Sequence, residues 1–255
     1  LPRNLVRLSG TFLHRYLHSV VDYFNFSAHR GQLSSYLSQL SQVKESEFSD
    51  WDKSEQLAFL INAYNAFTID MILRTQSTLP QDRYYKPRNL REKLQLISMI
   101  KNQQKINFIP LLGKILSLSE LEVDFIRRPG NYDEPRIHFA LNRASIDYPA
   151  LRNRAYSGID LDQQLESATR AFLSDRSRNR LDEVTGKLEV SELFDWYERD
   201  FERGWQGWPN LSQFFTQYRD SLADTVHTKE LLATDNFYIR FLEFNWILNE
   251  KLRTR

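Results

Sequence analysis

The chain of 255 residues contains no cysteine. Disulfides, zinc–thiolate sites, iron–sulfur clusters and thiol nucleophiles are therefore excluded. Glycine and proline are scarce, at 8 residues each, which excludes collagen-like chains and chains dominated by linkers. No apolar run reaches the roughly 20 residues that span a bilayer, so no integral membrane segment is expected. The 34 basic and 33 acidic residues leave a net charge of +1, so no bulk positive field points to nucleic acid.

The residues that are present are typical of a folded domain. Hydrophobic residues make up 41% of the chain and aromatic residues 13%, which excludes intrinsic disorder. No repeat, low-complexity tract or linker divides the sequence. We therefore expect one domain over residues 1–255.

Apolar residues recur at helical spacing through much of the chain. The segment 53–73 is apolar on nearly all sides, which predicts a central helix covered by its neighbours. Ser119 and Glu122 fit a capping box, which predicts a helix that runs to Arg127 or Arg128. Further helices are predicted for residues 9–24, 27–41, 88–101, 161–174, 191–201 and 210–222.

Shorter segments favour strands. Residues 136–142 alternate apolar and polar side chains, which predicts a strand with Arg136, His138 and Asn142 on one face. Two extended segments are predicted around Gly113, a hairpin that turns at Thr185-Gly186, and a last strand at 238–248. The expected fold class is α+β, a helix-rich single domain with a small, mainly antiparallel sheet packed around the central hydrophobic helix.

Several of these segments together resemble one family. They are VDY (21–23), LAFLINAYNAFTIDMIL (57–73), LSLSELEVDFIRR (116–128), PRIHFALNRAS (135–145), YPAL (148–151), LFDWYERDF (193–201) and FLEFNWILN (241–249). This pattern is similar to domain of unknown function 547, and the resemblance extends from about residue 20 to residue 249. The family occurs in bacterial proteins, often with export signals, and in plant proteins behind a leucine zipper.

The chain departs from the family pattern at positions that bear on chemistry. The resemblance implies cysteines where this chain has Arg143 and Tyr148, a histidine where it has Val123, and an aspartate where it has Asn245. Cysteine, histidine and an acid would be the nucleophile, the base and the orienting group of a thiol enzyme. This chain could not run such a reaction.

Two asparagines lie three residues apart on the central helix, and hence on one face. A buried amide needs hydrogen-bond partners, so Asn62 and Asn65 either line a polar cleft or hold neighbouring loop backbone. The sequence leaves both roles open. Tyr64 lies on a different face and is expected in the core.

His138 is the best single candidate for chemistry. Next to a serine it could act as a general base, with Ser145 or a water molecule as the nucleophile. The alternative is a core histidine that holds its strand to a helix. Glu122 is likewise either catalytic or only the far member of the capping box. Asn62, Asn65, Arg136, Asn142, Arg143 and Asn245 are the expected ligand-binding residues.

Other charged groups carry weaker hypotheses. The locally basic segment 127–154 could form a cationic pocket for a carboxylate or a phosphate, although scattered surface arginines are the alternative. His14, His18 and Asp22 have helical spacing that suits a metal, but a solvated helix edge explains them as well. No metal site and no cofactor is predicted.

The sequence thus favours a catalytically degenerate member of the family that binds a small anionic ligand or a protein partner. Export to the periplasm or the exterior is expected from the resemblance and from the missing initiator methionine. One alternative is a hydrolase or acyl transferase that works through His138 and Ser145. Another is an interaction scaffold, which an exposed aromatic patch around Trp205 and Trp208 would favour.

Overall fold

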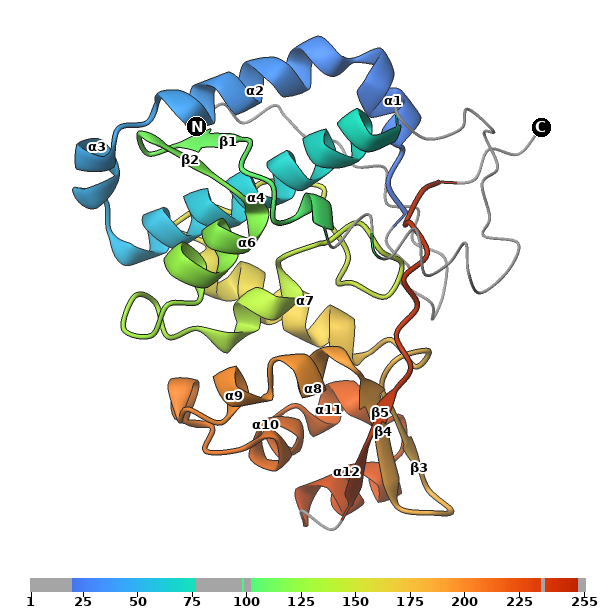
Figure 1. Cartoon of the computed structure of the whole chain (residues 1–255). Helices are drawn as coiled ribbons and strands as arrows, with labels where there is room; N and C mark the ends of the chain where they lie inside the picture. The colour runs from blue at the N-terminus through green and yellow to red at the C-terminus, as the bar shows by residue number, and fades with distance from the viewer. Residues whose placement is uncertain (1–19, 77–97, 99–101, 235–236, 252–255) are drawn as a thin grey trace.

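A computed structural model of the chain describes residues 20–76, 98, 102–234 and 237–251. The predictions for residues 9–24 and 88–101 fall mostly outside these residues, as do His14 and His18. The described chain is helix-rich and carries two small sheets, so the α+β fold class is confirmed (Figure 1).

The first elements of the described chain surround one long helix. In chain order they are α1 (Tyr23–Ala28), α2 (Arg30–Gln42), α3 (Glu45–Ser49), α4 (Lys53–Gln76), β1 (Ile109–Leu111), β2 (Lys114–Leu116), α6 (Leu118–Glu120), the π-helix η1 (Leu121–Ile126) and the 3₁₀-helix η2 (Pro135–Phe139).

The remaining elements begin with α7 (Leu161–Leu173), which lies between the two halves of the molecule, and continue with those of the other half. The others are β3 (Arg180–Asp182), β4 (Lys187–Ser191), α8 (Leu193–Trp196), α9 (Glu198–Phe201), η3 (Trp205–Gly207), α10 (Leu211–Gln217), α11 (Arg219–Leu222), α12 (Val226–Ala233) and β5 (Tyr238–Leu242).

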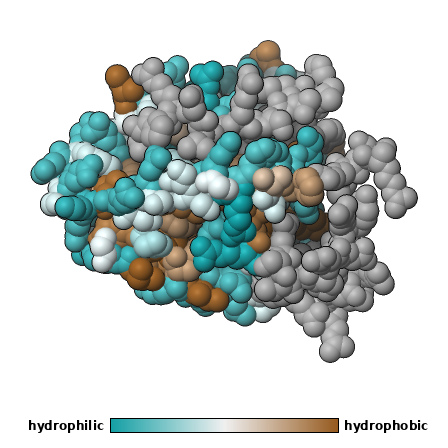
Figure 2. Space-filling model, turned by 90° about the horizontal axis from the view of Figure 1, so that it is seen from above, coloured by the Kyte–Doolittle hydropathy of each residue, from teal (hydrophilic) through white to brown (hydrophobic). Residues whose placement is uncertain are grey.

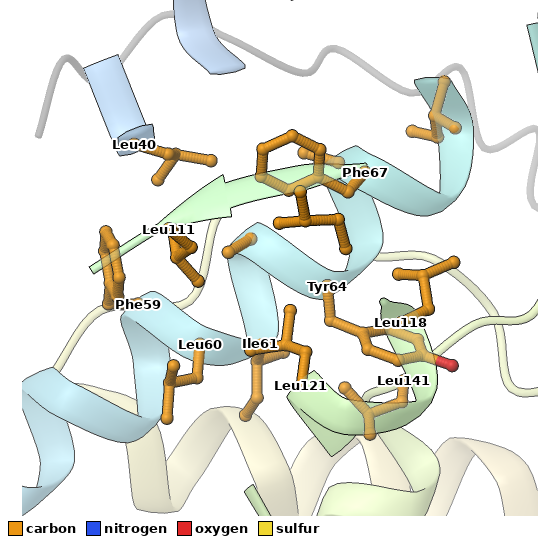
Figure 3. Packing of buried hydrophobic residues seen from close by; sticks show 14 of the residues in the cluster. Leu40, Phe59, Leu60, Ile61, Tyr64, Phe67, Leu111, Leu118, Leu121 and Leu141 are labelled. Atoms are coloured by element: carbon orange, nitrogen blue, oxygen red, sulfur yellow. The ribbon is translucent and has the colours of Figure 1, made fainter. Parts of the chain in front are cut away.

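The helix α4 is the central helix that the sequence predicts. Its segment Lys53–Thr75 is long and apolar enough to cross a membrane, but 94% of its most apolar window is buried inside the protein. Leu60, Ile61 and Phe67 point to different neighbours around the helix, which explains why its apolar residues do not form a single stripe (Figure 3).

Two hydrophobic cores divide the molecule. One surrounds α4 and includes α2, the β1–β2 hairpin and η1; the other lies among α8, α9, α10 and α11 and is rich in phenylalanine. The 3₁₀-helix η2 lies at their boundary, because Ile137 belongs to the first core and Phe139 to the second. In Figure 1 the first half lies above and the second below, with α7 between them.

The described strands form two antiparallel pairs and one parallel pair. The β1–β2 and β3–β4 hairpins are antiparallel, as predicted, and β5 pairs with β4 in parallel. The helices α8 to α12 fill the connection from β4 to β5, and a crossover of that length suits parallel strands. The chain then runs back beside the first core, where the Val21 nitrogen donates to the Asn249 carbonyl at 2.7 Å.

The predicted strand 136–142 is wrong. Pro135 starts a 3₁₀-helix there, and the Glu134 side chain accepts a hydrogen bond from the Arg136 nitrogen. Alternation suggested one exposed face, yet Arg136 and His138 are both buried. They can be buried because acidic partners lie beside them inside the protein.

Two helix predictions also need correction. Ser117 and Glu120 form the capping box, in place of Ser119 and Glu122. Both pairs have the required spacing, so the pattern alone does not distinguish them. The single helix predicted for 191–201 is two short helices, α8 and α9, which are separated at Tyr197.

Candidate functional site

A cluster of charged side chains lies where the two cores meet. Glu122 comes from η1, His138 from η2 and Asp200 from α9, and each of these residues is at most 3% exposed. Buried charges are stable only with partners, and here arginines supply them. π-helical turns are rare and are often found at functional sites, which makes the position of Glu122 notable.

The carboxylate of Glu122 has three partners. Arg143 donates to its Oε2 through Nη2, Arg127 lies 3.6 Å from its Oε1, and the Tyr64 hydroxyl donates to Oε2 at 3.3 Å. Burial would raise the pKa of Glu122, but the charges of Arg143 and Arg127 outweigh burial and lower the pKa. Tyr64, predicted as a core residue, lies between Leu118 and Leu141 with its hydroxyl beyond them (Figure 3).

A second carboxylate holds the histidine. Asp200 Oδ2 lies 2.9 Å from His138 Nε2 and accepts from Arg127 Nε at 2.7 Å. Burial works to raise the pKa of Asp200, but the hydrogen bonds from His138 and Arg127 hold the pKa at about 2. Burial lowers the pKa of His138 below 6.5, with the Arg127 charge adding to the effect. Near neutral pH His138 is therefore neutral, and its Nε2–H donates to an ionised Asp200.

Aromatic rings enclose this group. The Tyr197 ring stacks on His138, with centroids 3.8 Å apart and planes 18° from parallel. The Arg127 guanidinium lies 4.6 Å from the centre of the same ring, and that of Arg143 lies 5.8 Å from the rings of both Tyr148 and Tyr197. Guanidinium groups stack favourably on such faces, so Tyr197 holds the cluster together.

Ser145, the predicted nucleophile, does not contact His138 in the hydrogen-bond network of the cluster. Ser145 Oγ donates to the Asn245 carbonyl at 2.7 Å, and Ser145 pairs with Leu248 in an isolated antiparallel bridge. His138 Nε2 is held by Asp200. The hydrogen bonds therefore bring His138, Glu122 and Arg143 into one cluster and leave Ser145 outside it.

Asn62 and Asn65 both hold loop backbone. Asn62 donates to the Tyr156 carbonyl at 2.8 Å and accepts from the Tyr156 nitrogen at 2.9 Å. Asn65 donates to the Ala140 carbonyl and accepts from the Asn142 nitrogen, each at 2.9 Å. Each amide thus satisfies one donor and one acceptor of a loop that has no secondary-structure partner there.

The remaining predicted ligand-binding residues are also engaged. Asn142 donates to the Pro149 carbonyl and accepts from the Ala144 nitrogen, both at 2.7 Å. The Asn245 nitrogen donates to Asp147, and its side chain accepts from the Ile247 nitrogen. Arg136 forms ion pairs with Glu134 and Asp162 at 2.7 Å, away from the Glu122 cluster.

An exposed aromatic patch around Trp205 and Trp208 would favour the scaffold alternative, but Trp205 is half-buried and Trp208 is buried. Trp208 is only 3% exposed and packs on Phe214 and Tyr218 in the second core. Within the described residues, no group of three or more His, Asp or Glu side chains is arranged to hold a metal ion.

Sequence reasoning missed Asp200 and Tyr197. Both lie in the segment LFDWYERDF, which carried part of the family resemblance but no recognisable catalytic motif. An aspartate three residues after a tyrosine is common on any exposed helix. Only the pairing of α9 with η2 shows that it is buried beside a histidine.

Fold and site together define an α+β domain with a buried cluster of ion pairs between two cores. Residues 48–173 match a family described as "Protein of unknown function, DUF547". This segment, which contains Glu122, His138 and Arg143, belongs to the DUF547 family. Searches of curated proteins and of solved structures return no match.

Besides Asn245, three residues depart from the family pattern. Arg143 and Tyr148, where the resemblance implies cysteines, are neighbours in space. Val123, where it implies a histidine, is 52% exposed, whereas the neighbouring Glu122 is buried. The two cysteine positions therefore meet at the cluster, and a fixed positive charge occupies one of them.

Proposed function

We propose that this DUF547 domain is a binding protein without catalytic turnover, and that its ligand is a small anion held at the cluster. The observation that carries the proposal is the ion pair between Arg143 and the buried Glu122. A guanidinium adds bulk and a permanent charge, and it neither attacks a carbonyl nor moves a proton near neutral pH. Arg143 thus fills a position at which a nucleophile would have to stand.

The charges of the cluster favour an anion. Arg127, Arg143 and Arg203 face the carboxylates of Glu122 and Asp200, with Arg203 Nε 3.7 Å from Asp200 Oδ1. Because His138 is neutral near pH 7, one positive charge remains in excess. The arginine side chains are between 21% and 37% exposed, so they reach solvent while the carboxylates do not. Carboxylates and phosphates are the usual partners of such guanidinium groups.

The alternative of a hydrolase is less well supported. It needs His138 to take a proton from Ser145 or from a water molecule. His138 Nε2 already faces Asp200, and the Ser145 hydroxyl is bound to the Asn245 carbonyl. Neither contact prepares an attack on a substrate.

Anion binding is tested with inorganic phosphate and two matched arginine variants. Arg203→Gln removes the most exposed arginine of the cluster, and Arg180→Gln removes an arginine of similar exposure that pairs with Glu189 on the β-sheet. Thermal unfolding is followed with increasing phosphate at constant ionic strength. We expect phosphate to raise Tm less in Arg203→Gln than in the wild type, and equally in Arg180→Gln and the wild type. An equal effect in all three proteins would refute the anion site.

The absence of turnover is tested separately. Hydrolysis of p-nitrophenyl acetate is compared between the wild type and His138→Gln, with circular dichroism to check the fold. We expect both proteins to show the same slow background rate. A rate that His138→Gln abolishes in a folded protein would establish the hydrolase in place of the binding domain.

Export is part of the proposal because the family resemblance includes proteins with export signals. Fractionation of the source cells with an antibody against the domain tests it. Recovery in the periplasm or the medium is expected, and recovery only with cytosolic markers would contradict it.

A further inference from the structure

A cavity separate from the cluster lies beside the central helix. Its volume is ≈ 50 Å³, and it is enclosed by α1, α2, α4 and the loop 151–156. Figure 1 shows α2 running above α4. Leu33, Ile69 and Leu151 contribute apolar side chains to its walls. The face over these helices is mostly hydrophilic, with apolar groups visible between charged ones (Figure 2).

Two arginines line this cavity, and neither forms an ion pair with a described residue. Arg152 donates a long hydrogen bond of 3.5 Å to the Gln164 carbonyl, and its guanidinium lies 5.5 Å from the centre of the Tyr156 ring. Arg154 is exposed at the edge. Arg127, Arg136 and Arg143, by contrast, each pair with a carboxylate.

Two buried polar atoms of the same wall lack partners among the described residues. They are the Tyr156 hydroxyl, on a residue that is 3% exposed, and Arg152 Nε. A buried donor without a partner costs about 1–3 kcal/mol, so such groups are rare in folded proteins. The Asn62 amide in this wall is satisfied by the Tyr156 backbone. The unused donors are therefore concentrated on Arg152 and Tyr156.

We propose that this cavity binds a short-chain carboxylate. The carboxylate group would accept from Arg152 and from the Tyr156 hydroxyl, and the hydrocarbon chain would lie against Leu33 and Ile69. A cavity needs about 10–15 Å³ to hold one water molecule. The ≈ 50 Å³ of this cavity therefore suits a chain of about three to five carbon atoms. The site uses none of the residues of the Glu122 cluster, and it goes beyond the anion site proposed there.

The test is a chemical-shift titration of ¹⁵N-labelled protein with sodium butyrate at constant ionic strength. Two variants remove the proposed donors: Tyr156→Phe and Arg152→Gln. Because the Tyr156 hydroxyl has no partner, Tyr156→Phe should fold with unchanged or higher Tm. We expect saturable shifts for the wild type and Kd values raised roughly tenfold or more in each variant, as for loss of a hydrogen bond to a charged group.

Three comparisons determine whether the site is the one proposed. Resonances of the loop 151–156 report on this cavity, and butyrate should shift them in Arg203→Gln, a variant of the Glu122 cluster, with the same Kd as in the wild type. n-Butanol supplies the chain without the charge, and inorganic phosphate supplies charge without the chain; each should bind more weakly than butyrate. The proposal is overturned if Tyr156→Phe and Arg152→Gln bind butyrate with the wild-type Kd, or if n-butanol or phosphate shifts the same resonances as strongly as butyrate.

Discussion

Arg143 and Glu122 depend on each other. Glu122 is 2% exposed, and Arg143 is its closest cationic partner. Breaking a buried ion pair by removing one member typically costs about 3–5 kcal/mol, because the other charge stays buried without compensation. We therefore expect Arg143→Gln to lower the free energy of unfolding by about that amount, measured by urea denaturation.

A double variant separates the effect of an unpaired buried charge from the effect of lost side-chain packing. In Glu122→Gln/Arg143→Gln no buried charge is left alone, so it should be more stable than Arg143→Gln. Arg240→Gln is the control, since Arg240 pairs with Glu189 at a side-chain exposure of 62% and such pairs contribute about 0–1 kcal/mol. If Arg143→Gln lowered the free energy of unfolding no more than Arg240→Gln does, the Arg143–Glu122 pair would not stabilise the fold as its geometry indicates.

The cluster should make the protein sensitive to acid. The folded-state pKa of Asp200 is about 2, below its usual 3.8, and the pKa values of Glu122 and His138 are also lowered. Groups with lowered pKa values bind more protons when unfolded, so the stability they contribute is lost as the pH falls. The histidine part should be lost as the pH falls below 6.5, and the Asp200 part between about 3.8 and about 2.

Urea unfolding from pH 7 to about pH 2 measures this loss. Asp200→Asn removes one titrating group and its Arg127 pair, so it should be less stable at pH 7 and lose less stability on acidification. Parallel curves for Asp200→Asn and the wild type would show that Asp200 does not titrate as proposed.

At the residue scale the sequence pointed to part of the buried cluster. His138, Glu122 and Arg143 stood out because each is chemically capable or departs from the family pattern. Asp200 did not, because its importance comes from a contact across 62 residues of chain. Such a contact depends on how two helices pack, and no local pattern encodes it.

At the element scale, hydrophobic periodicity predicted the secondary structure correctly where one side or all sides of a segment are apolar. The helix α4 was predicted for that reason. The β3–β4 hairpin was predicted from its turn at Thr185-Gly186, and around Gly113 the sequence left a hairpin and a pair of extended segments both open. The 3₁₀-helix η2 was missed because its polar residues are buried with acidic partners, which alternation cannot reveal. Propensity and pattern are local quantities, and here tertiary contacts override them.

The loop before α7 makes a close contact with the start of α4. A Cβ atom on Gly158 would lie 2.5 Å from Glu55 Cγ and 2.9 Å from Glu55 backbone atoms, closer than real Cβ atoms approach. Gly158→Ala must therefore displace either the loop or the helix, and we expect it to destabilise the fold by about 1–3 kcal/mol.

Gly31 is the matched control for that substitution. It lies in α2, and a Cβ atom there would meet nothing within 4 Å. Because alanine favours a helix over glycine, Gly31→Ala should raise the free energy of unfolding by up to about 1 kcal/mol. Opposite signs in thermal unfolding are the expected result; equal effects would mean that the Glu55 contact does not constrain the loop.

At the scale of the whole molecule, three features of the described chain join the two cores in addition to α7. They are the Glu122–Asp200 cluster, the helix η2 and the chain after β5, which returns along one side to α1 (Figure 1). The parallel pairing of β4 with β5 and the return of residues 244–251 to Val21 were not predicted from the sequence. Both bring together segments far apart in the chain, and short-range patterns carry no signal for them.

Asn249 is the point at which this returning chain is fixed. It is 1% exposed; its Oδ1 accepts from the Tyr23 hydroxyl at 2.8 Å, and its Nδ2 donates to Asn142 Oδ1 at 3.3 Å. Asn249→Ala would leave the Tyr23 hydroxyl buried without a partner, and we expect a loss of about 2–3 kcal/mol. The exposed Asn153, mutated to alanine, is the control and should change stability by less than about 0.5 kcal/mol.

Hydrogen exchange shows whether Asn249 stabilises the whole returning chain or only its own contacts. The Val21 nitrogen bonds to the Asn249 carbonyl, and the Asn249 nitrogen to the Ala144 carbonyl. Release of the returning chain should therefore speed exchange at Val21 and Asn249 together, while amides in α10 keep their protection. Tyr23→Phe removes the unpaired hydroxyl, so Asn249→Ala should cost less in that background. Equal costs in both backgrounds, with exchange unchanged at Val21, would show that the two ends of the described chain are held independently of this asparagine.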